Sequence, residues 1–156
     1  MPFRRLVFAT VVSVAACSPG FPSGDDITAA VQNAPKLKSV DITPLNASGI
    51  IGSLIISGWD RPSPELSAGI GFPNLAPDAA GARYPMHIHP GSVCNGVGIV
   101  VHDLGAPASS VAPGITYPTL VLPSVALPGA HLASGYYFDV HAPNDPTGPP
   151  LGCALF

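Results

Sequence analysis

The stretch that best indicates the fold class is Gly49-Ile50-Ile51-Gly52-Ser53-Leu54-Ile55-Ile56-Ser57-Gly58, which is followed by Trp59-Asp60-Arg61-Pro62. A short apolar run that is rich in isoleucine and ends at a turn is typical of a β-strand. Other short segments have a similar pattern and also lie between turn residues: 38–45, 66–72, 84–89, 97–102, 116–121, 135–141 and 151–156. Together these eight segments predict an all-β domain, an antiparallel Greek-key β-sandwich or barrel. Pro118 places its segment at a sheet edge.

The composition supports this fold class and excludes others. A chain of 156 residues suits one domain. Its 17 glycines and 20 prolines disfavour long helices, because a proline inside a helix costs about 3 kcal/mol. Hydrophobic residues make up 47% of the chain and charged residues 10%, the opposite of a disordered composition. With six Lys and Arg residues and a net charge of −3, the chain lacks the basic face that nucleic-acid binding needs.

The first residues predict an export signal. Arg4 and Arg5 precede the uncharged run Leu6–Ala16, which is too short to span a bilayer but suits the apolar part of a signal peptide. The run continues into Val14-Ala15-Ala16-Cys17, which resembles a bacterial lipobox, in which the cysteine is acylated and becomes the new N-terminus. The alternative is an ordinary signal peptide with an incidental cysteine.

The lipobox resemblance implies an extracytoplasmic protein that is anchored to the bacterial membrane by lipid on Cys17. Residues 1–16 would be the signal peptide, residues 17–36 a flexible tether and residues 37–156 the β domain. Cys94 and Cys153 then remain in an oxidising compartment, so we expect them to form a disulfide. Two free thiols are the alternative.

The histidines carry the chemical signal. His87 and His89 are two residues apart in a predicted strand, so both imidazoles would point to one face. His141 ends another predicted strand and would complete a set of three if the two strands are neighbours. Such a set suits a copper or zinc ion. The alternative for a His-x-His pair is an exposed polar surface.

Several motifs resemble the copper/zinc superoxide dismutases. The segment His87-Ile88-His89-Pro90-Gly91-Ser92-Val93-Cys94 is similar to the family's His-x-His segment, in which a cysteine follows the pair. The step of ten residues from His131 to His141 is similar to the stretch before the family's last copper histidine, and 151–155 resembles its C-terminal strand. A chordin-type domain is the related alternative, suggested by Asn95-Gly96 and by Tyr136-Tyr137.

The resemblance implies roles for particular residues. His87, His89 and His141 match the copper ligands, and Cys94 and Cys153 match the disulfide. His131 matches a position that is not a ligand in the family, so its expected role is structural.

The chain also departs from the family. It lacks the zinc loop, so zinc is not expected, and His102 could only approximate the histidine that bridges copper to zinc. Pro150 replaces the arginine that guides superoxide, and 142–149 is too short for the steering loop. Asp103 and Asp139 are expected on a strand surface, with orientation of a ligand imidazole as the alternative.

We therefore expect a copper-binding lipoprotein of the superoxide dismutase-like superfamily with weak or absent dismutase activity. Two alternatives stay open. One is a surface dismutase that uses copper alone, and the other is a β domain without metal that serves as a binding or structural module. The sequence gives no indication of a nucleic-acid partner.

Overall fold

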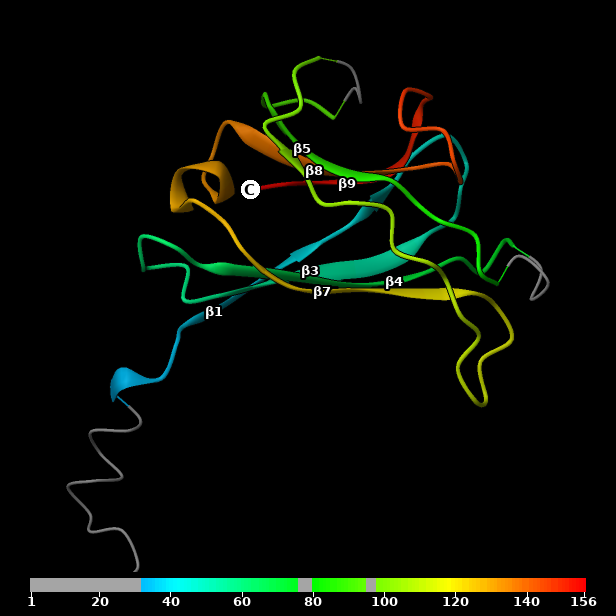
Figure 1. The fold of residues 1–156 in the computed structure, drawn as a ribbon, viewed down its shortest axis with the longest axis horizontal. Helices are drawn as coiled ribbons and strands as arrows, with labels where there is room; N and C mark the ends of the chain where they lie inside the picture. The colour runs from blue at the N-terminus through cyan, green and yellow to red at the C-terminus, as the bar shows by residue number, and fades with distance from the viewer. Residues whose placement is uncertain (1–31, 76–79, 95–97) are drawn as a thin grey trace, which may run out of the picture. The chain divides into compact units, whose positions relative to one another are not determined.

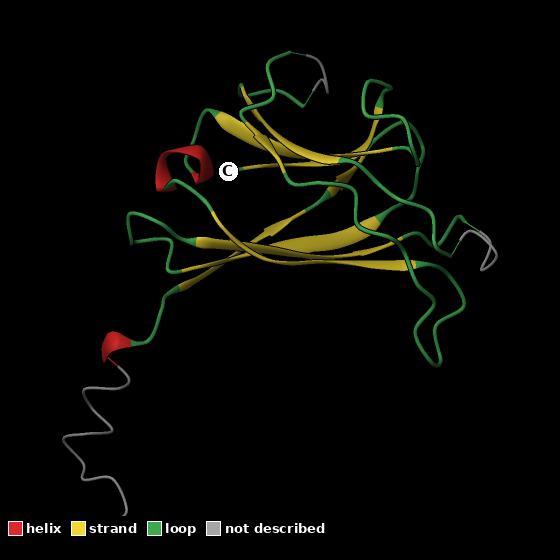
Figure 2. Ribbon diagram, in the orientation of Figure 1, coloured by secondary structure: helices red, strands yellow, loops and turns green. Residues whose placement is uncertain are grey.

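The computed structural model describes residues 32–75, 80–94 and 98–156, and residues 35–156 form one compact unit. The predicted signal peptide, Cys17 and most of the predicted tether lie outside the described residues. The described part is all-β, as predicted, and its strands form two antiparallel sheets that face each other as layers (Figures 1 and 2). Among the helices of this part, none has both the length and the apolar character needed to cross a bilayer.

The two sheets are open at their edges. In the described residues, one sheet has four strands in the order β1-β3-β4-β7, with the bounds Leu37–Asp41, Ile51–Ser57, Glu65–Gly71 and Thr119–Ala126. The other has five strands in the order β2-β9-β8-β5-β6, with the bounds Thr43–Pro44, Pro150–Leu155, Tyr136–His141, Met86–Pro90 and His102–Asp103. A short 3-10 helix, η2 (Gly129–Leu132), precedes β8. The molecule is therefore a sandwich and not a closed barrel.

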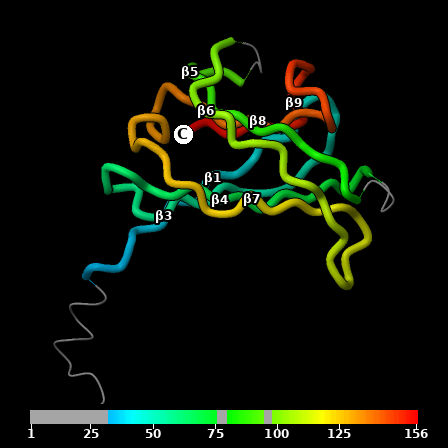
Figure 3. The backbone as a smooth tube through the Cα atoms, in the orientation of Figure 1, coloured from blue at the N-terminus to red at the C-terminus, as the bar shows by residue number. Residues whose placement is uncertain are grey.

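The chain passes repeatedly from one sheet to the other. It crosses between β4 and β5, returns between β6 and β7, and crosses again through η2 to β8 (Figure 3). As a result, β5 and β8 become direct neighbours although about 50 residues separate them in the sequence. This pairing is what assembles the candidate site described below.

Alternation along the strands builds the core between the sheets. In β3, Leu54 and Ile56 are fully buried, whereas Ile51 and Ile55 on the other face are exposed. Full burial of such a side chain stabilises the fold by about 1.5–3 kcal/mol. The same alternation in the neighbouring and facing strands supplies the rest of the core, which includes Leu66, Ile70, Met86, Ile88, Leu120, Leu122, Phe138 and Val140.

Two predicted strands differ from the structure. The segment 38–45 is broken at Ile42, so that β1 belongs to one sheet and β2 to the other. The break places the Ile42 side chain in the core, and its backbone N–H donates to the carbonyl of Gly52. Within the described residues 98–102 of the segment predicted as a strand at 97–102, only His102 lies in a strand, β6, although the backbone N–H of Val101 also donates to the carbonyl of Ile88 in β5. The predicted edge position near Pro118 is confirmed, because β7 is an edge strand.

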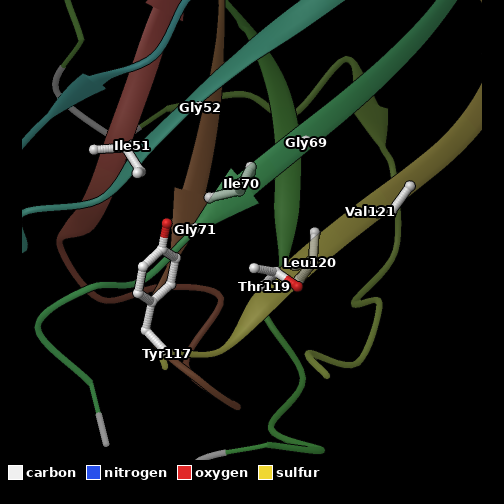
Figure 4. Close-up of a pocket in the computed structure, with 9 residues that line it drawn as sticks. All are labelled: Ile51, Gly52, Gly69, Ile70, Gly71, Tyr117, Thr119, Leu120 and Val121. Atoms are coloured by element: carbon white, nitrogen blue, oxygen red, sulfur yellow. The ribbon is translucent and has the colours of Figure 1, made fainter. Parts of the chain in front are cut away.

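A shallow apolar groove of about 330 Å³ marks the outer face of the four-stranded sheet (Figure 4). Gly69 and Gly71 of β4 form its floor, and Ile51 and Tyr117 stand beside it. A side chain at Gly71 would collide with the Tyr117 ring. The groove contains no histidine, cysteine or carboxylate, so the chemistry predicted from the sequence lies on the other sheet.

Candidate metal centre

Strand β5 carries the His-x-His pair on the outer face of the five-stranded sheet. His87 and His89 alternate with Ile88, whose side chain is buried in the core between the sheets. The two imidazole rings lie 5.7 Å apart, centre to centre. Although they point outward from the sheet, their residues are only 7% and 3% exposed. The pair is therefore covered, and the exposed polar surface considered as an alternative is excluded.

The structure brings His141 to this pair. It ends β8, the strand next to β5, and its ring centre lies 5.1 Å from that of His87. On the same strand, the Tyr137 ring stacks on His89 at 5.1 Å and helps to cover it. The three imidazoles that the sequence singled out thus lie in one buried cluster.

Asp139 is a fourth member of the cluster, and the expectation that it lies on a strand surface was wrong. Its side chain is fully buried. Asp139 Oδ2 lies 3.3 Å from His89 Nε2 and 3.2 Å from His141 Nε2, and its Oδ1 lies 3.8 Å from His87 Nδ1. The sequence held the signal, because residues two apart on a strand share a face, and this applies to Asp139 and His141 as well as to the pair on β5.

Strand register explains why these side chains meet. His87 pairs with Asp139, and Asp139 pairs in turn with Cys153 of β9. On its other side, His87 pairs with Asp103 of β6. Paired residues share a face with Cβ atoms about 4.5–5.5 Å apart, so these four form a row across the outer face. The row ends at the predicted disulfide between Cys153 and Cys94, which is present with Cα atoms 6.1 Å apart.

Backbone carbonyls fix two of the imidazoles. His89 Nδ1 lies 3.1 Å from the carbonyl oxygen of Ile99, and His141 Nδ1 lies 2.8 Å from that of Gly148. Because a carbonyl only accepts, each Nδ1 carries the proton and donates it. Each Nε2 is then left with its lone pair, and both Nε2 atoms face Asp139. Such an outer hydrogen bond is the usual means of orienting a histidine for a metal ion.

The four groups together are able to hold a metal ion. One donor atom from each of His87, His89, Asp139 and His141 can be chosen so that all lie within 4.8 Å of one another. Ligands at the usual bond lengths of about 2.0–2.2 Å around a tetrahedral ion stand roughly 3.3–3.6 Å apart. The contacts of Asp139 with His89 and His141, at 3.3 and 3.2 Å, are close to that spacing.

The polar atoms of the cluster lack other partners. Within the described part of the chain, both Asp139 oxygens, His87 Nδ1, His89 Nε2 and His141 Nε2 are buried and make no hydrogen bond. Burial raises the pKa of Asp139, although the three nearby histidines oppose this effect. Burial also lowers the pKa of His87, which keeps its imidazole in the neutral form that binds metal. Buried polar groups without partners are costly, so a cation among them would be strongly stabilised.

His102 and His131 lie apart from the cluster. His102 pairs with Ile88, whose side chain points into the core, so His102 shares the inner face of the sheet and does not join the other three histidines. Its possible role as a bridging ligand is therefore not supported by its position. His131 lies in η2 and packs against His102 and Tyr136, with ring centres 4.8 and 5.0 Å apart.

Fold and site together define a disulfide-linked β-sandwich protein with a buried cluster of three histidines and one aspartate, as far as the described residues show. A scan against protein-family models gives no match for the chain, and a search of curated proteins finds no significant relative.

Proposed function

We propose that the protein is an extracytoplasmic copper-binding protein of the superoxide dismutase-like superfamily, with His87, His89, Asp139 and His141 as its ligands. The observation that carries the proposal is the convergence of these four buried donors with no other polar partners among the described residues. Imidazole nitrogens suit copper and zinc, whereas magnesium and calcium prefer sets of oxygen ligands. The matches of the three histidines to the copper ligands favour copper over zinc.

The disulfide supports the proposed compartment. Disulfides persist in oxidising environments and are rare in the cytosol. The bond between Cys94 and Cys153 closes a long segment of the domain, since the two cysteines are 59 residues apart. Lipid attachment at Cys17 remains part of the proposal and rests on the resemblance to a lipobox alone. Labelling with a lipid precursor tests it, and label that persists in Cys17→Ala would contradict it.

The surroundings of the cluster favour weak or absent dismutase activity. Bound copper would supply one-electron chemistry, and the chain must admit and position the anion. Pro150, which stands where the resemblance implies an arginine, pairs directly with His141 and offers no charge. The low exposure of His87, His89 and His141 also limits access for an anion. For comparison, losing one hydrogen-bond donor that stabilises an anionic transition state costs about 100- to 1,000-fold in rate.

The decisive experiment is a titration of the chelated protein with Cu²⁺ and with Zn²⁺. We expect one tight copper equivalent in the wild type and its loss in His87→Ala and His141→Ala. Asp139→Asn should also weaken copper binding. Its matched control is Asp41→Asn, which should not, since Asp41 lies on the exposed face of β1. Tight binding that survives in His141→Ala would overturn the assignment. Superoxide removal by the loaded protein, compared with free copper, measures the residual activity, and robust activity that is lost in His141→Ala would show that the departures matter less than proposed.

One observation favours a second candidate, a β domain that holds protons in place of metal. The separations of 3.3 and 3.2 Å between Asp139 Oδ2 and the two Nε2 atoms also suit hydrogen bonds from an imidazolium to a carboxylate. In that case calorimetry would show no heat of copper binding. Nuclear magnetic resonance of the ring nitrogens would then show a protonated Nε2 at neutral pH.

A further inference from the structure

A second pair of histidines lies on the inner side of the five-stranded sheet. His102 belongs to β6 and His131 to η2, two elements that are far apart in sequence from each other. Their ring centres are 4.8 Å apart, and the rings are tilted by 59°. Both residues are partly exposed, whereas the histidines of the buried cluster are buried.

Each ring of this pair has a nitrogen that is free to bind a ligand. His102 Nε2 and His131 Nδ1 are buried and make no hydrogen bond within the described residues, and therefore none to each other. Neutral imidazole carries one proton, so its other nitrogen offers a lone pair. Two unpaired buried nitrogens on adjacent rings are the same kind of signal that marks the buried cluster.

The spacing of the two rings suits a shared ion. With bonds of about 2.0–2.1 Å, two imidazoles on one ion at a bent, roughly tetrahedral angle have ring centres about 5 Å apart. The 4.8 Å between His102 and His131 is close to this value and to the 5.1 Å between His87 and His141. A straight two-coordinate arrangement would need a separation of about 6 Å.

The ring of His131 is also held in place. It packs against the Tyr136 ring at 5.0 Å, and η2 leads directly into the strand that carries Tyr136. Burial, together with the nearby His131, lowers the pKa of His102, which keeps that imidazole neutral at physiological pH. Both features leave the pair ready to act as ligands without a large rearrangement.

We propose that His102 and His131 form a second, exchangeable site for a copper ion, separate from the buried cluster. Because the protein supplies only two donors, the remaining coordination positions are open to water or to a small ligand. We therefore expect this site to bind copper more weakly than the four-donor cluster, by about tenfold or more. The site goes beyond the proposed function, which needs only the buried cluster.

The test is to measure how many copper ions the full chain binds and how many each single-substitution variant binds. The wild type should bind a tight and a weaker Cu²⁺ equivalent, and the weaker one should broaden the ring-proton resonances of His102 and His131. His131→Phe, which keeps an aromatic ring against Tyr136, and His102→Phe should each lose only the weaker equivalent. His141→Ala should keep the weaker one and lose the tight one.

The outcomes separate this inference from the proposed function. A wild type with a single tight equivalent, or a weaker equivalent that persists unchanged in both Phe variants, overturns the second site and leaves the buried cluster intact. A weaker equivalent that is lost in the Phe variants supports the second site, even if no tight equivalent is found. Circular dichroism of each variant confirms that the sheet fold is retained, and His131→Gln serves as the alternative if His131→Phe does not fold.

Discussion

Asp139 is the residue on which the chemistry of the cluster depends. It brings negative charge into a place where its side chain is fully buried and where burial, the largest effect, raises its pKa. In the unfolded chain its carboxyl ionises near the ordinary value of 3.8, whereas the folded protein holds the proton to higher pH. Folding stability is therefore lost as the pH rises through that interval, and a bound cation would restore it.

The substitution Asp139→Asn tests whether the buried carboxylate lowers the stability of the metal-free protein while it contributes to copper binding. In the chelated protein at pH 7, we expect it to increase the free energy of unfolding by about 1–3 kcal/mol, because the amide buries no charge. Copper affinity should fall by at least the roughly 10- to 100-fold that losing an outer partner of a ligand costs, because Asp139 is itself a proposed ligand. Denaturant unfolding with chelator and copper titration measure the two effects, with Asp41→Asn as the control. Destabilisation by several kcal/mol would instead indicate that Asp139 is paired with an imidazolium.

Because two histidines have lowered pKa values, we expect the folded protein to lose stability as the pH falls below neutrality. Burial lowers the pKa of both His102 and His87 from the ordinary value of 6.5. The unfolded chain therefore takes up protons first as the pH falls below 6.5, so stability that is present above this pH is lost below it. We expect the unfolding temperature of the chelated protein to drop between pH 7.5 and 5.5. His102→Phe should make that drop smaller, and an identical drop in the variant would contradict this account for His102.

At the scale of the elements, strand alternation made most of the site predictable. The two-residue period placed His87 and His89 on one face, and the same period would have placed Asp139 beside His141. The sequence could not show that the outer face is covered, because this depends on the carbonyls of Ile99 and Gly148, which belong to segments without a regular pattern. Long-range pairing also decided that β6 includes only His102 of the predicted strand 97–102, together with Asp103, which lies outside that prediction.

The turn after β8 allows a test of whether the hydrogen bond from His141 Nδ1 to a backbone carbonyl orients this imidazole. Asp145 Oδ1 accepts the backbone N–H of Gly148 at 2.8 Å, and the carbonyl of Gly148 accepts the proton of His141 Nδ1. Asp145→Ala should loosen this turn and weaken copper binding by about tenfold, since support for a ligand histidine is worth about 10- to 100-fold. The exposed hydrogen bond itself should contribute only about 1 kcal/mol to stability. Copper titration checks the first effect, with Asp41→Ala as the control, and unchanged affinity would show that the turn does not orient His141.

At the scale of the whole molecule, the order of the strands within the two sheets could not be predicted from the sequence. The eight predicted segments are compatible with many arrangements of two sheets, and only burial in the folded domain selects β5 and β8 as neighbours. The break at Ile42 also depends on packing between the sheets. Burial of the Ile42 side chain in the core is favoured over a continuous strand through 38–45. Local alternation thus predicts which faces are apolar, whereas the partners of each strand depend on the packing of all of them.

The disulfide joins the stability of the whole domain to the candidate site. It links β9 to the segment that follows β5, and Cys153 pairs directly with Asp139 in the sheet. For a loop closed by cysteines 59 residues apart, the chain-entropy model gives a stabilisation of about 4 kcal/mol. We expect the double variant Cys94→Ala with Cys153→Ala to lose an amount of that order in denaturant unfolding with chelator present.

Copper binding should fall as well in this double variant, because the segment that follows Cys94 carries Ile99, whose carbonyl holds His89 in place. Freed from the covalent link, this segment would hold the carbonyl less firmly, and the affinity of the folded protein should drop by about tenfold. A titration below the unfolding transition separates this effect from the loss of stability. If affinity is unchanged while stability falls, the disulfide supports the sandwich alone, and the orientation of His89 comes from its stacking on Tyr137.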